Sequence, residues 1–230
     1  MTEISKIGYI GVGVMGGRMC RNLAAKASVP VMAYDRDPDK VAALADAGVT
    51  AAPDIAALVA TVDLIFICVP GEPQVRDACL GAGGVLECAR AGQTVVDMTT
   101  ATPDIAREIS AKLAEKGIDF ADAPVDKGVS SAADGTLSIM VGGSAGVFAR
   151  LRPTLACMGT DITHCGPVGT GQVVKLMNNL VVFLNTSALA EALAIGRRAG
   201  VDAGGEIDVV LAIRSRLTRR NHREIGRAHV

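Results

Sequence analysis

The stretch Lys6–Leu23 constrains the fold of this chain most, because it joins an apolar run, a glycine-rich turn and an amphipathic helical pattern. The turn has the form G-x-G-x-x-G, with glycines at Gly11, Gly13 and Gly16. In such a turn the first glycine permits the bend, the second lets a pyrophosphate approach the backbone, and the third lets the helix pack on the strand. The pyrophosphate then binds free N–H groups at the helix N-terminus. The stretch therefore predicts a dinucleotide-binding unit.

A carboxylate stands where such a site needs one. The next apolar segment, Val29–Tyr34, ends in Asp35, nineteen residues after Gly16. A carboxylate there accepts hydrogen bonds from the adenine ribose and repels a 2′-phosphate, so Asp35 favours NAD. Arg36 beside it would instead pair with the phosphate of NADP. We expect NAD, with NADP as the alternative, and a glycine-rich turn without any ligand stays open.

Composition is that of a globular protein with a sizeable aliphatic core, since 50% of the 230 residues are hydrophobic and Trp is absent. A net charge of −1 gives no general electrostatic case for nucleic acid or an anionic membrane. The six cysteines show no zinc spacing, so we expect no metal site and buried, reduced thiols. We also expect no signal peptide, no membrane span and a cytoplasmic location.

Apolar segments and helical patterns alternate after Asp35, which predicts a doubly wound parallel sheet. Strands are expected at 63–70, 94–97 and 119–123, and helices at 38–47, 54–61, 74–80 and 103–116. A loop at 122–128, strands at 135–143 and 161–165 and a helix at 148–158 follow. Residues 172–199 predict one long, largely apolar helix. We therefore expect an α/β Rossmann-type domain over residues 1–166 and an all-α domain over 167–230, with the boundary at Pro167.

Lys175 and Asn179 are four residues apart on the expected long helix and share one of its faces. A lysine set among apolar residues can transfer a proton to or from a substrate oxygen. The alternative is a surface lysine whose aliphatic stem lies along an amphipathic helix. Spacing alone leaves both interpretations open.

Four motifs, in order and at compatible spacings, resemble those of the β-hydroxyacid dehydrogenase family, which contains 3-hydroxyisobutyrate dehydrogenases and tartronate semialdehyde reductases. The family's G-x-G-x-M-G turn is matched at Gly11–Gly16, and its D-A-P-V-S-G-G loop at Asp122–Val125 and Gly128. Its G-T-L-x-x-M-V-G-G and G-x-G-x-x-x-K-x-x-N-N segments are matched at Gly135–Gly143 and Gly169–Asn179. The resemblance covers residues 6 to about 200 and is specific for the family but not for the substrate.

The resemblance implies NAD(P)-dependent hydride transfer between a small, carboxylate-bearing β-hydroxyacid and its semialdehyde. It makes Lys175 the general acid/base and Asn179 the residue that orients the substrate oxygen. The residues expected to bind the cofactor are Gly11, Gly13, Val14, Met15, Gly16, Asp35, Arg36, Val69, Pro70, Gln74 and Thr100. Those expected to bind the substrate are Asp126, Lys127, Gly128, Lys175 and Asn179.

The chain departs from the family in its substrate loop, where Asp126-Lys127 replaces the usual Ser-Gly. The family's serine meets the substrate carboxylate, which an aspartate would repel. Lys127 would then supply the missing positive charge, and the alternative is a solvated loop charge.

A second departure lies at the C-terminal end, where the resemblance fades near Arg214 and residues 214–230 hold six Arg and one Glu. We expect a truncated helical domain, with one further helix at 202–213 and non-native or disordered sequence at 214–230. A genuine basic tail is the alternative. Two other functions stay open: a catalytically impaired dinucleotide-binding fragment and a 6-phosphogluconate dehydrogenase-like enzyme.

The long helix at 172–199 predicts self-association. Its apolar residues point in nearly all directions, and a helix that is apolar all round must be buried all round. One α/β domain covers only one side of it. We therefore expect a homo-oligomer.

Overall fold

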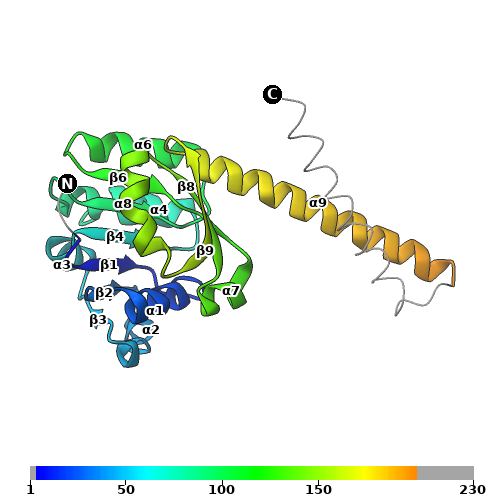
Figure 1. The fold of residues 1–230 in the computed structure, drawn as a ribbon, viewed down its shortest axis with the longest axis horizontal. Coiled ribbons are helices and arrows are strands. Elements are labelled where there is room, and N and C mark those ends of the chain that lie inside the picture. The colour runs from blue at the N-terminus through cyan, green and yellow to red at the C-terminus, as the bar shows by residue number, and fades with distance from the viewer. Residues whose placement is uncertain (1–3, 201–230) are drawn as a thin grey trace. The chain divides into compact units, whose positions relative to one another are not determined.

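The computed structural model describes residues 4–200 of the chain (Figure 1). By its internal contacts the chain divides into two units, one that ends at Leu176 and one that begins at Met177. The first unit contains the sheet. The described part of the second unit is the continuation of α9, the long helix Thr170–Arg198.

Across the described residues, nine strands form one sheet in the order β3-β2-β1-β4-β5-β6-β8-β7, with β9 beside β8 (Figure 1). The strands β1 to β6 are parallel, which confirms the expected fold class. Beyond β6 the sheet changes direction, because β8 is antiparallel to β6 and β7, and β9 is parallel to β8. The bounds are β1 Ile7–Ile10, β2 Val31–Tyr34, β3 Thr50–Ala51, β4 Leu64–Ile67, β5 Thr94–Asp97, β6 Asp119–Asp122, β7 Val125–Asp126, β8 Leu137–Gly142 and β9 Gly159–Gly166.

Helices cover both faces of the sheet. The buried side chains form two clusters, and strand residues alternate between them: Tyr9 and Phe66 belong to one, Ile65 and Ile67 to the other. The first cluster contains residues of α1 and α8, and the second contains residues of α3, α4 and α6. The bounds are α1 Gly16–Lys26, α2 Pro38–Ala42, η1 (a 3₁₀-helix) Ala45–Ala47, α3 Ile55–Thr61, α4 Glu72–Leu80, α5 Val85–Cys88, α6 Pro103–Ala114, α7 Gly128–Asp134 and α8 Ala145–Leu155.

Several elements differ from the sequence expectation for local reasons. The helix expected at 38–47 is interrupted, because Leu44 donates to the Val41 carbonyl in a 3₁₀ turn and Gly48 ends η1 in the left-handed region. The helix expected at 148–158 begins earlier, because the Ser144 side chain caps it. The short elements β3, α5, β7 and α7 were not expected, since a few residues carry no periodic pattern.

The expectation of buried thiols is wrong for four of the six cysteines. All six are free, but only Cys20 and Cys79 are buried, and the others are partly exposed: Cys68, Cys88, Cys157 and Cys165. Burial raises the pKa of the Cys20 thiol to about 12, which makes it a core residue without thiolate chemistry.

The expectations for the C-terminal residues and for the domain boundary stay predictions. The helix expected at 202–213 and the character of residues 214–230 lie outside the described residues. The boundary at Pro167 stays a prediction, since Pro167 precedes α9 within the first unit.

Candidate active site

The residues expected to bind the cofactor follow four neighbouring parallel strands. Gly11 follows β1, Asp35 follows β2, Val69 follows β4 and Thr100 follows β5. The carboxyl ends of parallel strands meet at one edge of the sheet, so the fold brings these positions together. The strand order reverses at β1, which lies between β2 and β4, and ligands of open α/β sheets bind at such a point.

The glycine-rich turn has the geometry that a pyrophosphate requires. Gly11 has φ +88°, and a Cβ there would lie 2.3 Å from the Cys68 carbonyl oxygen. A Cβ on Gly16 would lie 2.0 Å from the Gly11 carbonyl oxygen, whereas one on Gly13 would meet nothing within 4 Å. Helix α1 begins without a side-chain cap and without an acidic residue in its first turn. Its first N–H groups can therefore bind an anionic group, which fits a dinucleotide.

Asp35 is held in a fixed orientation beside this turn. Its carboxylate accepts a hydrogen bond from the Val12 N–H at 2.8 Å and another from the Asp37 N–H at 3.0 Å. Arg36, the residue expected to favour NADP, forms an ion pair with Asp77 of α4. The guanidinium of Arg36 therefore already faces a carboxylate.

Lys175 is a buried residue and not a surface lysine, with 7% of the residue exposed. Its ammonium donates a hydrogen bond to Asp126 Oδ1 at 2.8 Å. Two residues expected in one site, 49 positions apart in the sequence, are thus in direct contact. Because a buried charge is costly unless it is paired, this contact is what allows Lys175 to lie in the interior.

Asp122 fixes the start of the helix that carries Lys175. Its buried carboxylate accepts hydrogen bonds from the Gly169 N–H at 2.6 Å and the Gln172 N–H at 2.8 Å. Burial raises the pKa of this carboxyl, and the backbone hydrogen bonds act in the opposite direction. Sequence reasoning placed Asp122 in the substrate loop without giving it a role. The glycines Gly169 and Gly171, which belong to the matched motif at the start of this helix, are the sequence signal for that role.

Gln172 connects the same helix to the loop after β5. Its side-chain oxygen accepts from the Ala101 N–H at 3.0 Å, and its amide nitrogen donates to the Thr99 carbonyl at 2.6 Å. The two bonded residues, Thr99 and Ala101, stand on either side of Thr100, which is expected to contact the cofactor. Gln172 is fully buried, and a lone amide side chain near the start of an apolar helix could have drawn attention to it.

Other expected residues have different surroundings. The Lys127 ammonium pairs with Asp161 of β9 and donates to the Thr136 carbonyl at 3.2 Å. Gln74 lies half-buried on α4, and Gly128 begins α7 with φ +76°. Asn179 belongs to the part of α9 in the second unit, so the geometry of the first unit does not include it.

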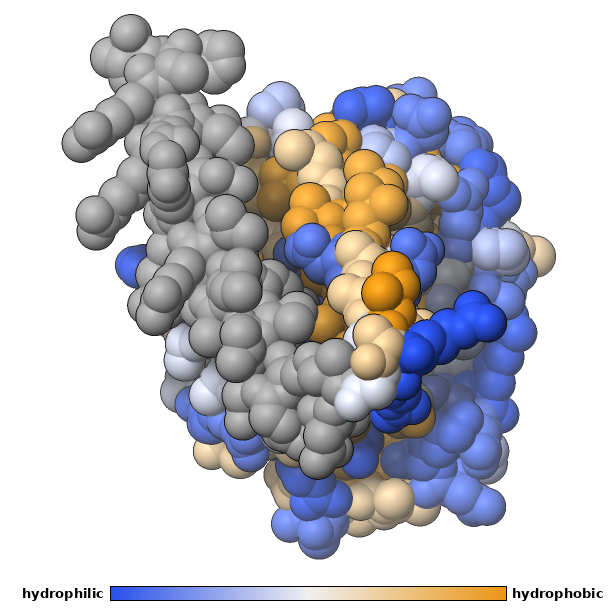
Figure 2. All heavy atoms as spheres, turned by 90° about the vertical axis from the view of Figure 1, so that its right-hand side faces the viewer, coloured by the Kyte–Doolittle hydropathy of each residue, from blue (hydrophilic) through white to orange (hydrophobic). Residues whose placement is uncertain are grey.

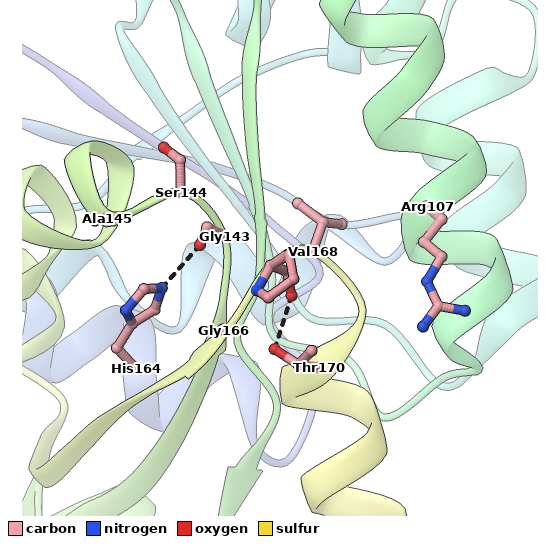
Figure 3. Close-up of a pocket in the computed structure, with 9 residues that line it drawn as sticks. Arg107, Gly143, Ser144, Ala145, His164, Gly166, Val168 and Thr170 are labelled. Carbon is pink, nitrogen blue, oxygen red and sulfur yellow. Dashed lines mark hydrogen bonds between the residues drawn. The ribbon is translucent and has the colours of Figure 1, made fainter.

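A surface pocket is lined by a different set of residues (Figure 3). Its walls come from the N-terminal end of α8, the end of β9, the turn before α9, and Arg107 of α6. His164 contacts the Gly143 carbonyl at 2.8 Å and stacks on Phe148, which lends the pocket one rigid wall. None of the residues expected to bind cofactor or substrate lines it. The candidate site is therefore defined by the strand ends and by Lys175.

Asp97, the last residue of β5, is a buried acid at the same edge. One of its oxygens accepts from the Thr99 N–H at 2.9 Å, and the other, Oδ2, has no hydrogen-bond partner. Asp97 is in register with Asp122 on the neighbouring strand. Burial raises the pKa of Asp97 to about 7, and the negative charge of Asp122 acts in the same direction.

Comparison with known proteins gives the following similarities. A family model described as the NAD binding domain of 6-phosphogluconate dehydrogenase matches residues 6–166. A second, described as NAD-binding of NADP-dependent 3-hydroxyisobutyrate dehydrogenase, matches residues 169–224. Among solved structures, a 3-hydroxyisobutyrate dehydrogenase of Mycobacterium tuberculosis is similar with a TM-score of 0.83 and 33% identity, over 91% of this chain and 71% of that one.

Curated relatives are similar over most of this chain. The 2-(hydroxymethyl)glutarate dehydrogenase of Eubacterium barkeri is 41% identical over 201 residues, 87% of this chain and 66% of that protein. The mitochondrial 3-hydroxyisobutyrate dehydrogenase of Bos taurus is 36% identical over 202 residues, 88% of this chain and 60% of that protein. The chain thus spans 60 to 66% of the length of these two relatives.

The buried Asp97 should make stability depend on pH. Its folded pKa of about 7 lies above the value of an unfolded aspartate, so its contribution is fully present below pH ~4 and is lost as the pH rises to ~7, by up to ~1.4 kcal/mol per pH unit. Asp97→Asn cannot ionise and should gain stability relative to the parent between pH 5 and pH 8. Urea denaturation at both pH values measures this. The exposed Asp104→Asn is the control, and an equal effect of Asp97→Asn at both pH values would contradict the assignment.

Proposed function

The chain belongs to the β-hydroxyacid dehydrogenase family, and we propose that it interconverts a small β-hydroxyacid and its semialdehyde by hydride transfer with NAD. The observation that carries the proposal is the buried Lys175 on a helix that Gln172 joins to the loop of Thr100. A proton-transfer group and an expected nicotinamide contact are thereby held by one turn of helix.

In this proposal, separate groups of residues bind the cofactor, transfer the proton and hold the substrate. The turn at Gly11–Gly16 and the start of α1 bind the pyrophosphate, and Asp35 binds the adenine ribose. Residues after β4 and β5, with Gln74 of α4, contact the nicotinamide half, which when bound supplies or accepts the hydride. Lys175 takes the hydroxyl proton during oxidation and returns it during reduction, and Asn179 orients the substrate oxygen. A small carboxylate-bearing substrate is held by the loop that contains Asp126, Lys127 and Gly128.

Helix α9 presents an apolar surface that needs a cover. By length and composition alone α9 could cross a membrane, a test that core helices of soluble proteins also pass. On the side of the molecule that Figure 2 shows, hydrophobic side chains gather near the centre and hydrophilic ones lie beside them. The large apolar side chains of α9 that are exposed are Val173, Val174, Leu176, Met177, Leu180, Val181, Val182, Phe183, Leu184 and Ile195. We propose that further copies of this chain cover them in a cytoplasmic homo-oligomer.

Replacing Lys175 tests the proposed chemistry. Lys175→Ala should lower kcat by ~10²–10⁴, the usual contribution of a general acid/base, while NAD affinity is largely kept. Lys112→Ala, which removes an exposed lysine of α6, is the matched control. Normal turnover by Lys175→Ala would refute its role. A parent chain that binds NAD without turning over any β-hydroxyacid would instead favour the impaired fragment.

Cofactor choice gives a second prediction. The ratio of kcat/KM with NAD to that with NADP should exceed one, because Asp35 repels a 2′-phosphate and Arg36 is already paired. Asp77→Asn frees Arg36 and should move the ratio several-fold toward NADP. Because the pair is exposed, the shift should shrink at high salt. A clear preference of the parent chain for NADP would overturn the NAD assignment.

Oligomeric state gives a third prediction. Size exclusion with light scattering should report a mass above that of one chain, because the exposed apolar side chains of α9 need a cover. Phe183→Glu, which places a charge on this surface, should reduce the mass. A monodisperse monomer of the parent chain would contradict the proposal.

A further inference from the structure

Helix α7, which directly follows the substrate loop, has little apolar packing of its own. It is seven residues long, and its one buried residue is Ala132. A short helix is stabilised mainly by the apolar face that it buries, and a single alanine provides little of that. Because α7 begins at Gly128, any movement of α7 is passed to the loop before it. The position of this loop therefore depends on how α7 is attached to the rest of the domain.

The chain enters α7 through a strained residue. Lys127 has φ +82°, and among the described residues it is the only non-glycine residue with a positive φ. Such a conformation is costly and persists only where the surrounding structure holds it. The ion pair between Lys127 and Asp161 attaches this end of α7 to β9. An exposed ion pair contributes little by itself, so the other end of α7 needs an attachment as well.

Asn22 of α1 provides the attachment at the C-terminal end of α7. Its side-chain amide donates hydrogen bonds to the Ala132 carbonyl at 2.9 Å and to the Ala133 carbonyl at 2.8 Å. Both carbonyls lie in the last turn of α7, where no partner within the helix is available to them. The approach is close, because a Cβ on Gly135 would lie 2.9 Å from Asn22 Oδ1. Asn22 thus binds the end of α7 by both of its amide hydrogens.

Helix α1 is a firm support for this attachment. Its residues Met19, Cys20 and Leu23 are buried in the core cluster on one face of the sheet. Helices α1 and α7 lie side by side (Figure 1). The N-terminus of α1 is also the proposed pyrophosphate site. One helix therefore carries the cofactor turn at its start and holds α7 at Asn22.

We propose that Asn22 is a positioning residue that fixes the substrate loop relative to the cofactor turn, with α7 as the link. It is six residues beyond Gly16, which is about 9 Å along the helix axis, so it acts without touching the cofactor. Its hydrogen bonds go to backbone carbonyls and not to the substrate loop itself. This inference rests on the proposed function, because that proposal makes the loop a substrate contact.

Replacing Asn22 tests the inference by separating substrate binding from cofactor binding. Asn22→Ala removes both donors and should raise KM for the hydroxyacid by about tenfold, the combined net contribution of two hydrogen bonds. The value of kcat should change less than KM. The affinity for NADH, measured by fluorescence titration, should stay unchanged, because α1 keeps its own packing on the sheet.

Two further variants separate this role from a general loss of stability. Asn22→Asp keeps the size of the side chain, but its carboxylate can only accept hydrogen bonds and faces two carbonyls, so KM should rise more than in Asn22→Ala. Lys26→Met is the matched control. The Lys26 ammonium also links α1 to a backbone carbonyl, that of Cys157 at 3.1 Å, which lies between α8 and β9 and outside α7. Its loss should leave KM unchanged.

Hydrogen exchange of the backbone amides measures the attachment in the full chain without any substrate. In Asn22→Ala the protected amides of α7 should exchange about tenfold faster, because their opening costs two fewer hydrogen bonds, whereas those of α1 should not change. Unchanged exchange in α7, or an equal rise of KM in Lys26→Met, would overturn the inference.

The two readouts keep this inference distinct from the proposed function. If the parent chain turns over no β-hydroxyacid but α7 exchanges faster in Asn22→Ala alone, the dehydrogenase proposal fails and the positioning role of Asn22 stands. If the parent chain is active and Asn22→Ala has the same KM, the dehydrogenase proposal stands and the role of Asn22 fails.

Discussion

The Asp122 carboxylate is the constraint on which the candidate site depends. It binds two backbone N–H groups at the start of α9, where the helix dipole also favours a negative charge. The helix start is thereby fixed to the end of β6, and Lys175 lies one turn further along. From the same segment of chain, Asp126 contacts the Lys175 ammonium. One strand end therefore sets both the origin of the helix and the position of Lys175.

The two acids at this edge are distinguished by their partners. Asp122 receives backbone donors on both oxygens, whereas Asp97 keeps one oxygen without a partner. Two carboxylates on neighbouring strands in a poorly solvated region do not both ionise readily. Burial raises the pKa of both carboxyls, but the backbone N–H groups of Gly169 and Gln172 act against this at Asp122, whereas the pKa of Asp97 is raised to about 7. Burial is the main cause of the raised pKa of Asp97, and the negative charge of Asp122 adds to it.

The sequence predicts the first half of this molecule well, because local patterns determine it. The glycine turn and the buried strands act over a few residues, and the structure shows both. The Asp54 and Thr102 side chains likewise cap α3 and α6 through local contacts. The contact between Asp126 and Lys175 could not be derived in this way. It requires the chain to reverse at β7 and β8 and return along β9, and two-residue elements such as β7 leave no periodic signal. The prediction that all six cysteines are buried was wrong for a similar reason, since the burial of a side chain depends on which helices cover the sheet.

The glycines at the start of α1, Gly11 and Gly13, have the same spacing as Gly169 and Gly171 at the start of α9, but their surroundings are opposite. Gly13 leaves open space at the start of α1, so an outside anion can approach the backbone. Gly171 has no such space: a Cβ there would lie 2.4 Å from the Met140 carbonyl oxygen and 2.8 Å from Asp122. The start of α9 is thus already occupied by the protein's own carboxylate and offers no site to a substrate anion. The Lys175 ammonium, one turn further along, is likewise paired with a carboxylate of the protein, that of Asp126.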